Sequence, residues 1–185
     1  MFYHASPVGG IEVLQPDISN HNEPLLYFSK KRENVLVYLS NAIEKLCRQT
    51  GFIHNGKWHT WASYGFDADG RLQLDEYYPD AIEDTYKGVS GYIYAADSVE
   101  ERKDIGITHA FATSLPVTVC GVEYVEDAFA EILKAEKAGL IRIRRYEQHD
   151  QKMLQWIEKT IRAEYAATAA PDYRYFLQEK FDFIE

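Results

Sequence analysis

The sequence lacks the features that mark several common protein classes. Its two cysteines, Cys47 and Cys120, are too few for a disulfide framework and lack the paired spacing of a zinc site. No apolar run approaches the roughly 20 residues that a membrane-spanning helix requires, and the N-terminus lacks the basic and hydrophobic stretches of a signal peptide. We therefore expect a cytoplasmic protein without membrane association, in which both cysteines are buried, reduced thiols.

Several nucleotide-binding and hydrolytic motifs are also missing. The chain has no Gly-x-Gly-x-x-Gly fingerprint and no P-loop, so classical Rossmann dinucleotide binding and ATP hydrolysis lack support. It has no Gly-x-Ser-x-Gly elbow either. His54 and His59 lack a helical i, i+4 partner and a cysteine pair, and we therefore expect no metal site.

The charge balance argues against broad binding of nucleic acids. The formal net charge is −9, whereas affinity for phosphates depends on clustered Lys and Arg. The acidic excess is uneven, because residues 1–49 carry as many bases as acids and residues 50–146 carry more acids than bases. We expect no nucleic-acid partner, and the N-terminal part is the one that repels an anionic ligand least.

Length and composition favour one folded domain. The chain has 185 residues, of which 46% are hydrophobic and 14% aromatic, and fourteen are tyrosines. This length is enough to bury a sizeable core, and the tyrosines indicate ring surfaces with polar tips. We predict a single domain over residues 1–185, with a core over 1–146 and a C-terminal helical extension over 147–185 that packs through Trp156.

The first fifty residues are predicted to form two short strands and a long helix. Phe2–Ser6 and the apolar run Leu25–Phe28 are strand candidates. Ser29 can accept a hydrogen bond from the first free N–H groups of a following helix. That helix, residues 30–49, repeats apolar side chains at helical period, and Gly51 follows it as a C-cap.

The rest of the chain is predicted to alternate short strands with helices. A hairpin turns at residues 67–70, and the strand Gly91–Ala95 is interior. The arginine-rich strand Leu140–Tyr146 is predicted at a sheet edge. The other predicted elements are strands at 11–14, within 52–78, at 109–113 and at 117–122, and helices at 79–86, 126–138, 149–168 and 171–180.

Three N-terminal motifs resemble the ADP-ribosyltransferase superfamily in its diphtheria-toxin and poly-ADP-ribose-polymerase branch. That branch has a Tyr/Trp-His-(Gly/Ala)-(Ser/Thr) first strand and a Tyr-Phe-(Ala/Ser) strand that leads into a helix with a second Tyr. Here the motifs read Tyr3-His4-Ala5-Ser6, Tyr27-Phe28-Ser29 and Tyr38. The resemblance covers the first fifty residues. It implies an α+β fold with a split antiparallel β core, in which two small sheets meet at a cleft, together with peripheral helices and a C-terminal helical appendage.

The resemblance also implies a site for NAD as a substrate. It places His4 against the adenosine-side ribose and Tyr27 and Tyr38 about the nicotinamide ring. Ser6 and Ser29 lie within the same motifs and are further candidates for binding NAD. When nicotinamide leaves its ribose, the transition state resembles an oxocarbenium ion, which a nearby carboxylate stabilises much as in glycoside hydrolysis.

Glu123 is our candidate for that catalytic carboxylate. It ends a β-like run, and family members often show Glu-Tyr followed by an aliphatic residue at this point. Arginine-directed transferases have Gln or Glu two positions earlier, where this chain has Gly121, so arginine modification is not expected. Glu126 is the alternative carboxylate, but with Asp127 it falls in the first turn of a predicted helix, where the helix dipole alone favours acids.

Each candidate residue also fits a purely structural role. His4 fits a core histidine satisfied by the main chain, and Tyr27 and Tyr38 fit ordinary core aromatics. Glu123 fits a surface or capping carboxylate, and Ser6 and Ser29 fit turn and cap residues.

Three functions follow as hypotheses. The first is transfer of ADP-ribose from NAD, or NAD glycohydrolysis, without a metal. The second is a catalytically inactive protein of the same fold that binds a nucleotide or a protein partner. The third is an RNA 2′-phosphotransferase. Such an enzyme needs several arginines near the phosphate, and this sequence has no convincing set of basic residues in the right places. The acceptor substrate and the oligomeric state cannot be deduced from these motifs.

Overall fold

The chain folds into a mixed α+β structure with antiparallel sheets, which confirms the predicted fold class at this level. The computed structural model describes residues 1–18, 23–56 and 63–184. Contacts divide the chain into two compact units. The first unit is Met1–Ser40, Phe66–Leu72 and Tyr86–Arg142, and the second is Asn41–Gly65, Gln73–Thr85 and Ile143–Glu185. That the whole chain folds as one domain stays a prediction.

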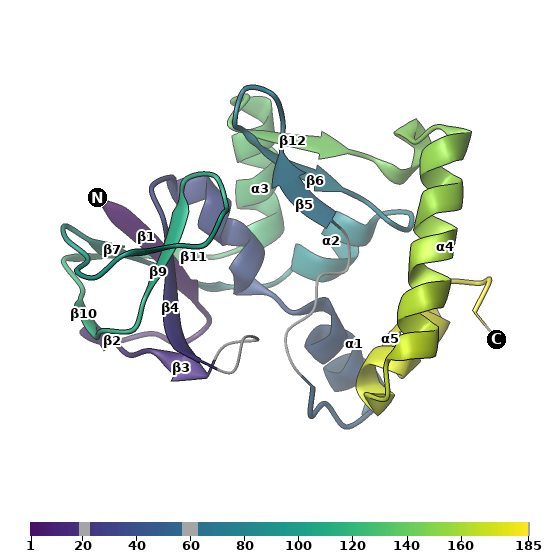
Figure 1. The fold of residues 1–185 in the computed structure, drawn as a ribbon, viewed down its shortest axis with the longest axis horizontal. Coiled ribbons are helices and arrows are strands. Elements are labelled where there is room, and N and C mark those ends of the chain that lie inside the picture. The colour runs from purple at the N-terminus through teal and green to yellow at the C-terminus, as the bar shows by residue number, and fades with distance from the viewer. Residues whose placement is uncertain (19–22, 57–62, 185) are drawn as a thin grey trace. The chain divides into compact units, whose positions relative to one another are not determined.

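The first unit is built on a seven-stranded sheet with the order β11-β7-β1-β4-β9-β8, in which β3 also pairs with β4. A short two-stranded ribbon, β10-β2, accompanies it (Figure 1). The strands are β1 (Phe2–Ser6), β2 (Val13–Leu14), β3 (Asp17–Ile18), β4 (Pro24–Ser29), β7 (Gly91–Ala96), β8 (Lys103–Asp104), β9 (Ala110–Thr113), β10 (Val117–Thr118) and β11 (Gly121–Val125). The strands predicted at the two N-terminal motifs are therefore confirmed, and β7 is interior as predicted.

The strand β1 is held unequally by its two neighbours. All five of its residues pair with β7, from Phe2 opposite Ala96 to Ser6 opposite Tyr92. With β4 it shares a single pair, Tyr3 opposite Ser29, within the described residues. The ladder between the two motif strands is therefore short, whereas β1 is firmly registered on β7.

One face of this sheet carries an apolar cluster. The rings of Phe28 and Phe111 stack at 5.8 Å between centroids. The Tyr94 hydroxyl donates to the Val8 carbonyl at 2.7 Å, which ties the β1–β2 connection over the same face. We call this side the cluster face. Its buried members are Leu14, Leu26, Phe28, Tyr94, Ala96, Val99, Phe111 and Val117.

The opposite face packs against the helix η1 (Arg32–Leu39), and we call it the helix face. A Cβ built on Gly91 of β7 would lie 2.6 Å from the Leu39 side chain and 3.1 Å from the Ser6 carbonyl oxygen. The approach of the helix to the sheet is therefore close enough to require glycine at this position.

The predicted single helix over residues 30–49 is wrong. Its first half is η1, a 3₁₀ helix, and its second half is the α-helix α1 (Ala42–Thr50). Ser40 and Asn41 between them are extended, and the Asn41 side chain accepts a hydrogen bond from the Ile43 N–H. A new N-cap thus interrupts the apolar repeat. The predicted C-cap is confirmed, because Gly51 adopts a left-handed conformation at φ 76°.

The region around Glu123 also differs from the prediction. The predicted strand at 117–122 is two strands, β10 and β11, with Cys120 between them. Cys120 is exposed, so the expectation of two buried thiols holds for Cys47 alone. Helix α3 (Ala128–Lys137) is capped by Asp127, whose carboxylate accepts from the Ala130 N–H. Glu126 therefore precedes the cap and does not lie in the first helical turn.

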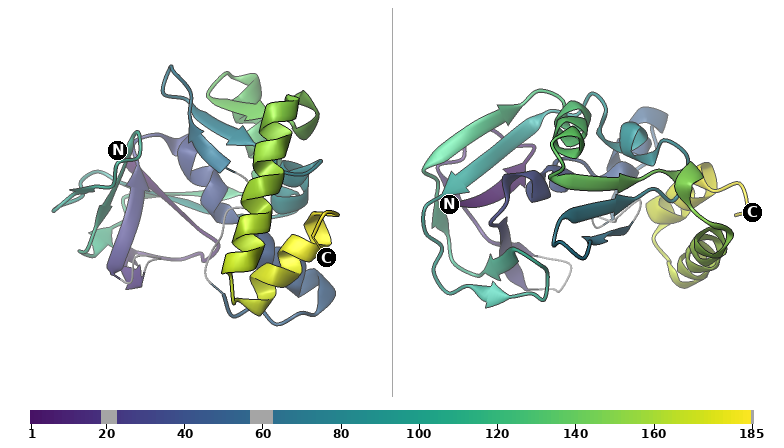
Figure 2. Two further views of the ribbon diagram at one scale, coloured as in Figure 1. Left: turned by 45° about the vertical axis from the view of Figure 1, so that its right-hand side comes forward. Right: turned by 90° about the horizontal axis from the view of Figure 1, so that it is seen from above.

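The second unit gathers the helices α1, α4 and α5 and most of a three-stranded sheet of order β12-β6-β5 (Figure 2). The predicted hairpin at residues 67–70 is confirmed between β5 and β6. The predicted strand residues Trp58 and Trp61, and His59, lie outside the described residues. The elements are β5 (Ser63–Phe66), β6 (Leu72–Asp75), α2 (Ala81–Tyr86), β12 (Ile141–Arg144), η2 (Tyr146–Gln148), α4 (Gln151–Ala167) and α5 (Pro171–Lys180).

Trp156 contributes only part of the packing that was predicted for it. Trp156 is exposed on α4 and meets the Tyr77 ring edge-on at 5.9 Å. The residues that α4 buries are Ile157 and Ile161. Packing of α4 therefore combines the edge contact of Trp156 with two buried isoleucines, one and five positions further along the helix. No helix among the described residues is both long and apolar enough to cross a bilayer.

Replacing Gly91 by Ala should destabilise the protein. The added methyl would press on the buried Leu39, and overpacking of this kind costs about 1–3 kcal/mol. Gly65→Ala is the matched control, because Gly65 also lies in a strand and a Cβ there meets nothing within 4 Å. Urea unfolding at neutral pH measures both. Equal midpoints for the two variants would contradict the close contact between η1 and β7.

Candidate functional site

His4 is anchored to the main chain of the second motif strand. Its Nδ1 lies 2.9 Å from the Tyr27 carbonyl oxygen. Because a carbonyl only accepts, Nδ1 carries the proton, and Nε2 of the neutral ring is left as an acceptor. Burial lowers the pKa of His4 and outweighs the opposing effect of this hydrogen bond, so the ring is neutral at pH 7. The structure thus brings His4 to the Tyr27 backbone.

The side chains of His4 and Tyr27 nevertheless lie on opposite faces of the sheet. Directly paired residues of antiparallel strands share a face, and successive residues alternate. His4 is opposite Tyr94 and lies on the cluster face, with its ring 5.8 Å from that of Phe28. Tyr27 shares the face of Ser29 and Tyr3, the helix face. The two side chains that were expected to bind one NAD molecule therefore leave the sheet on different sides.

Glu123 also lies on the face opposite His4. It pairs with Ile93 of β7, which pairs in turn with Ala5 of β1, the neighbour of His4. Glu123 is therefore on the helix face, whereas Val122 shares the cluster face with His4. The sheet itself therefore separates His4, the residue predicted to bind a ribose, from Glu123, the predicted catalytic carboxylate.

The Glu123 carboxylate is bound by an arginine. Arg32 of η1 donates from Nε to Glu123 Oε2 at 3.1 Å and from Nη2 to the other carboxylate oxygen, and Nη2 lies 2.8 Å from Glu131 of α3. The hydrogen bond to Glu123 raises the pKa of Arg32. Burial opposes ionisation of Glu131, but its bonds to Arg32 hold its pKa below the usual value. This cluster links η1, β11 and α3.

The two candidate serines hold turns. Ser6 accepts from the Val8 N–H at 3.1 Å. Ser29 is buried, donates to the His109 carbonyl oxygen and accepts from the Lys31 N–H at 3.1 Å. Since η1 begins at Arg32, Ser29 forms a turn before the helix and is not its N-cap. Tyr38, the remaining candidate, lies on η1 with an exposed side chain.

Asn34 is a polar residue that sequence reasoning missed. It lies in η1, is 6% exposed, and neither Oδ1 nor Nδ2 has a hydrogen-bond partner among the described residues. A buried amide without partners costs free energy, so such a group calls for an explanation. The signal in the sequence is that Asn34 directly precedes the apolar run Val35–Val37. A helix that is apolar on all sides is buried on all sides, so a polar residue within it is buried as well.

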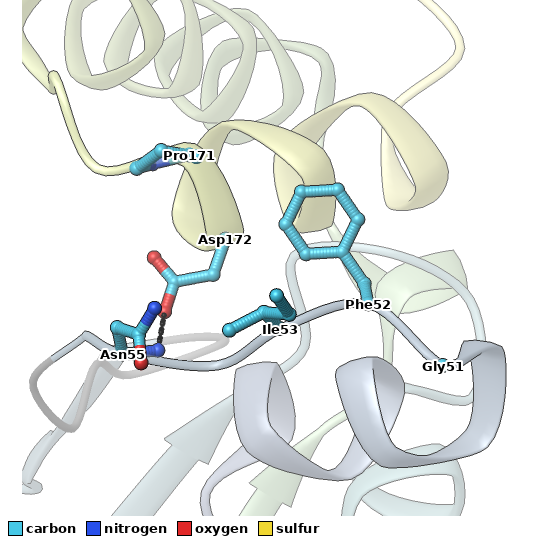
Figure 3. Close-up of a pocket in the computed structure, with 6 residues that line it drawn as sticks. All are labelled: Gly51, Phe52, Ile53, Asn55, Pro171 and Asp172. Carbon is cyan, nitrogen blue, oxygen red and sulfur yellow. Dashed lines mark hydrogen bonds between the residues drawn. The ribbon is translucent and has the colours of Figure 1, made fainter.

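The second unit holds a cavity of about 460 Å³ next to the start of α5 (Figure 3). Phe52, Ile53 and Pro171 supply apolar walls, and Asp172 supplies a carboxylate. Gly51 and Asn55 complete the lining.

No group of three or more His, Cys, Asp or Glu side chains in the described part of the chain is arranged to hold a metal ion. No family model matches the chain, and neither a curated protein nor a solved structure matches it.

Lowering the pH should reduce the stability of the protein because of His4. The unfolded histidine takes up a proton near pH 6.5, its ordinary pKa, whereas the folded ring resists protonation to a lower pH. The unfolded state therefore binds more protons in that window, and the free energy of unfolding decreases as pH falls below about 6.5. His4→Gln keeps a donor for the Tyr27 carbonyl but cannot titrate.

Urea unfolding between pH 8 and pH 5 tests this expectation. The stability difference between wild type and His4→Gln should stay constant above pH 7 and shift in favour of the variant below pH 6.5. Parallel pH profiles over the whole range would show that His4 is not the buried, neutral group described above.

Proposed function

We propose that this chain is a catalytically inactive nucleotide-binding protein with an ADP-ribosyltransferase-like core. The proposal accords with the order and spacing of the motifs at His4, Tyr27 and Tyr38. The observation that carries it is the separation of His4 and Glu123 by the sheet, with Glu123 bound by Arg32.

This arrangement opposes the transfer chemistry for a direct reason. Stabilising an oxocarbenium-like ribose requires a carboxylate whose charge is available at the reacting carbon, in the same cleft as the residues that hold the rest of NAD. Here the carboxylate already has a cation as its partner, and one NAD molecule would have to reach His4 and Glu123 on opposite faces of the sheet. Binding and catalysis are therefore separable in this chain.

Two features favour binding of a nucleotide in the first unit. The ladder between β1 and β4 is limited to one pair, so the main chain of β1 beyond Tyr3 is not held by β4. The amide of Asn34 keeps a donor and an acceptor without partners among the described residues, the complement of an adenine edge or of a carboxamide; because it is buried, a nucleotide would pair with it only if η1 opened. A nucleotide such as NAD carries both groups.

Transfer of ADP-ribose from NAD, or NAD glycohydrolysis, is the second candidate. Glu123 favours it to the extent that its side chain is 50% exposed, so a bound ligand could compete with Arg32 for it. The RNA 2′-phosphotransferase hypothesis gains nothing comparable. Arg32 is engaged by two carboxylates, and the Arg102 guanidinium lies over the rings of Phe2 and Phe111.

Titration calorimetry with NAD tests the binding function. We expect wild type to bind NAD and Asn34→Leu to bind it about tenfold more weakly, since a two-point amide contact contributes about 1–3 kcal/mol. The variant should unfold at the same or a higher urea concentration, because it removes an unsatisfied buried amide. Gln49→Leu removes an exposed amide from α1 and should change neither property. No heat of binding with wild type would refute the proposed function.

Release of nicotinamide distinguishes the two candidates. The inactive protein should release none above the buffer rate, and Glu123→Gln should leave NAD affinity unchanged. Glu126→Gln, three residues on and outside the Arg32 cluster, is the control. Turnover by wild type that Glu123→Gln abolishes and Glu126→Gln retains would establish the transferase or glycohydrolase instead.

A further inference from the structure

The cavity beside α5 has the composition of a site for an apolar ligand. Phe52 stacks on the Tyr175 ring, with centroids 4.3 Å apart and planes within 6° of parallel. Ile53 reaches along the same side of the cavity and is 71% exposed (Figure 3). Pro171 faces them from the start of α5. The walls are therefore aliphatic and aromatic, and one of them is already braced by a ring pair.

A single charged group interrupts these walls. Asp172 is 3% exposed, and its carboxylate lines the cavity. Burial opposes its ionisation, but the N–H groups of Asn55, Gly56 and Tyr173 hold the pKa of Asp172 below its usual value. The cavity thus contains an ionised carboxylate at neutral pH.

The two oxygens of this carboxylate are used unequally. Oδ2 accepts from the N–H groups of Asn55 at 3.1 Å and Gly56 at 2.7 Å, and His54 Nδ1 lies 2.9 Å away. Oδ1 accepts from the N–H of Tyr173 at 2.9 Å. Since each carboxylate oxygen offers two lone pairs, Oδ1 retains capacity for another donor.

The charge of Asp172 is balanced by dipoles more than by cations. Main-chain N–H groups of Asn55, Gly56 and Tyr173 supply its hydrogen bonds, and among the described residues His54 Nδ1 lies 2.9 Å from Oδ2. Of the described cations on α5, Lys180 lies 2.8 Å from Asp84 and Arg174 donates to the Tyr165 carbonyl. A cationic ligand would therefore meet an attractive field in an otherwise apolar cavity.

We propose that this cavity binds a small organic cation, an ammonium group on an apolar or aromatic body. The ammonium donates to Asp172 Oδ1, and the body packs against Phe52, Ile53 and Pro171. A neutral ligand of the same shape gains the apolar contacts but not the charge-assisted hydrogen bond, which is about twice as strong as a neutral one. This inference uses the second unit alone and goes beyond the proposed nucleotide function.

Ligand-observed NMR and calorimetry with 2-phenylethylamine test the proposal, with 2-phenylethanol as the neutral counterpart of the same shape. At pH 7 the amine is protonated, and we expect it to bind at least tenfold more tightly than the alcohol. Raising the salt concentration should reduce the difference in affinity between the amine and the alcohol. Equal affinity of the two probes, or binding of neither, would overturn the proposal.

Ile53→Lys provides a test that does not disturb the carboxylate. The substitution places an ammonium group at the cavity wall and should abolish binding of the amine, and the exposure of Ile53 makes loss of fold unexpected. Ile18→Lys is the matched control, because Ile18 is 75% exposed in the first unit. If both variants bind the amine as wild type does, the amine is not in this cavity and the proposal fails.

Asp172→Asn tests the carboxylate itself. The change keeps the shape of the side chain and should reduce amine affinity at least tenfold while leaving the weak binding of the alcohol unchanged. Because Asp172 also holds Asn55 and Gly56, its unfolding midpoint must be measured alongside. Should this variant fail to fold, Ile53→Lys decides the outcome. Unchanged amine affinity in folded Asp172→Asn would refute the role of the charge.

Discussion

The pairing of β1 and β11 with β7 is the constraint on which the first unit depends. Ile93 lies between Ala5 and Glu123, and Tyr94 lies between His4 and Val122. Because the side-chain period of a strand is two, this register alone decides that imidazole and carboxylate leave the sheet on opposite sides. The proposal that this unit binds a nucleotide without transferring ADP-ribose follows from that division.

The helix face then determines what surrounds Glu123. The helix η1 approaches β7 closely at Gly91, and its first residue, Arg32, reaches the carboxylates of Glu123 and Glu131. A pair of acids on one guanidinium links two elements to the helix. The same helix buries the amide of Asn34 without a protein partner. In the second unit, by contrast, the buried Asp172 accepts hydrogen bonds from the main-chain N–H groups of Asn55 and Gly56, in the segment that follows α1. It also lines a cavity.

Much of the architecture was readable from the sequence. Both motif strands, the interior strand at Gly91–Ala96 and the helix Pro171–Lys180 form as predicted, because apolar period and turn residues act locally. The break at Ser40 and Asn41 was not foreseen, since a capping side chain inside an apolar repeat looks like an ordinary polar position. The placement of the candidate site residues could not be predicted, for another reason. Which face a side chain takes depends on cross-strand register, and register is a property of partners far apart in the chain.

The central claim is that Ile93 stands with Glu123 and Ala5 on one face while His4 stands on the other. A nuclear Overhauser experiment on protein with labelled Ile methyl groups tests it most directly. The account predicts contacts from the Ile93 methyl groups to the Ala5 methyl and the Glu123 side chain, and from the His4 ring to the rings of Tyr94 and Phe28. Contacts from the His4 ring to the Ile93 methyl groups or to the Glu123 side chain would contradict it.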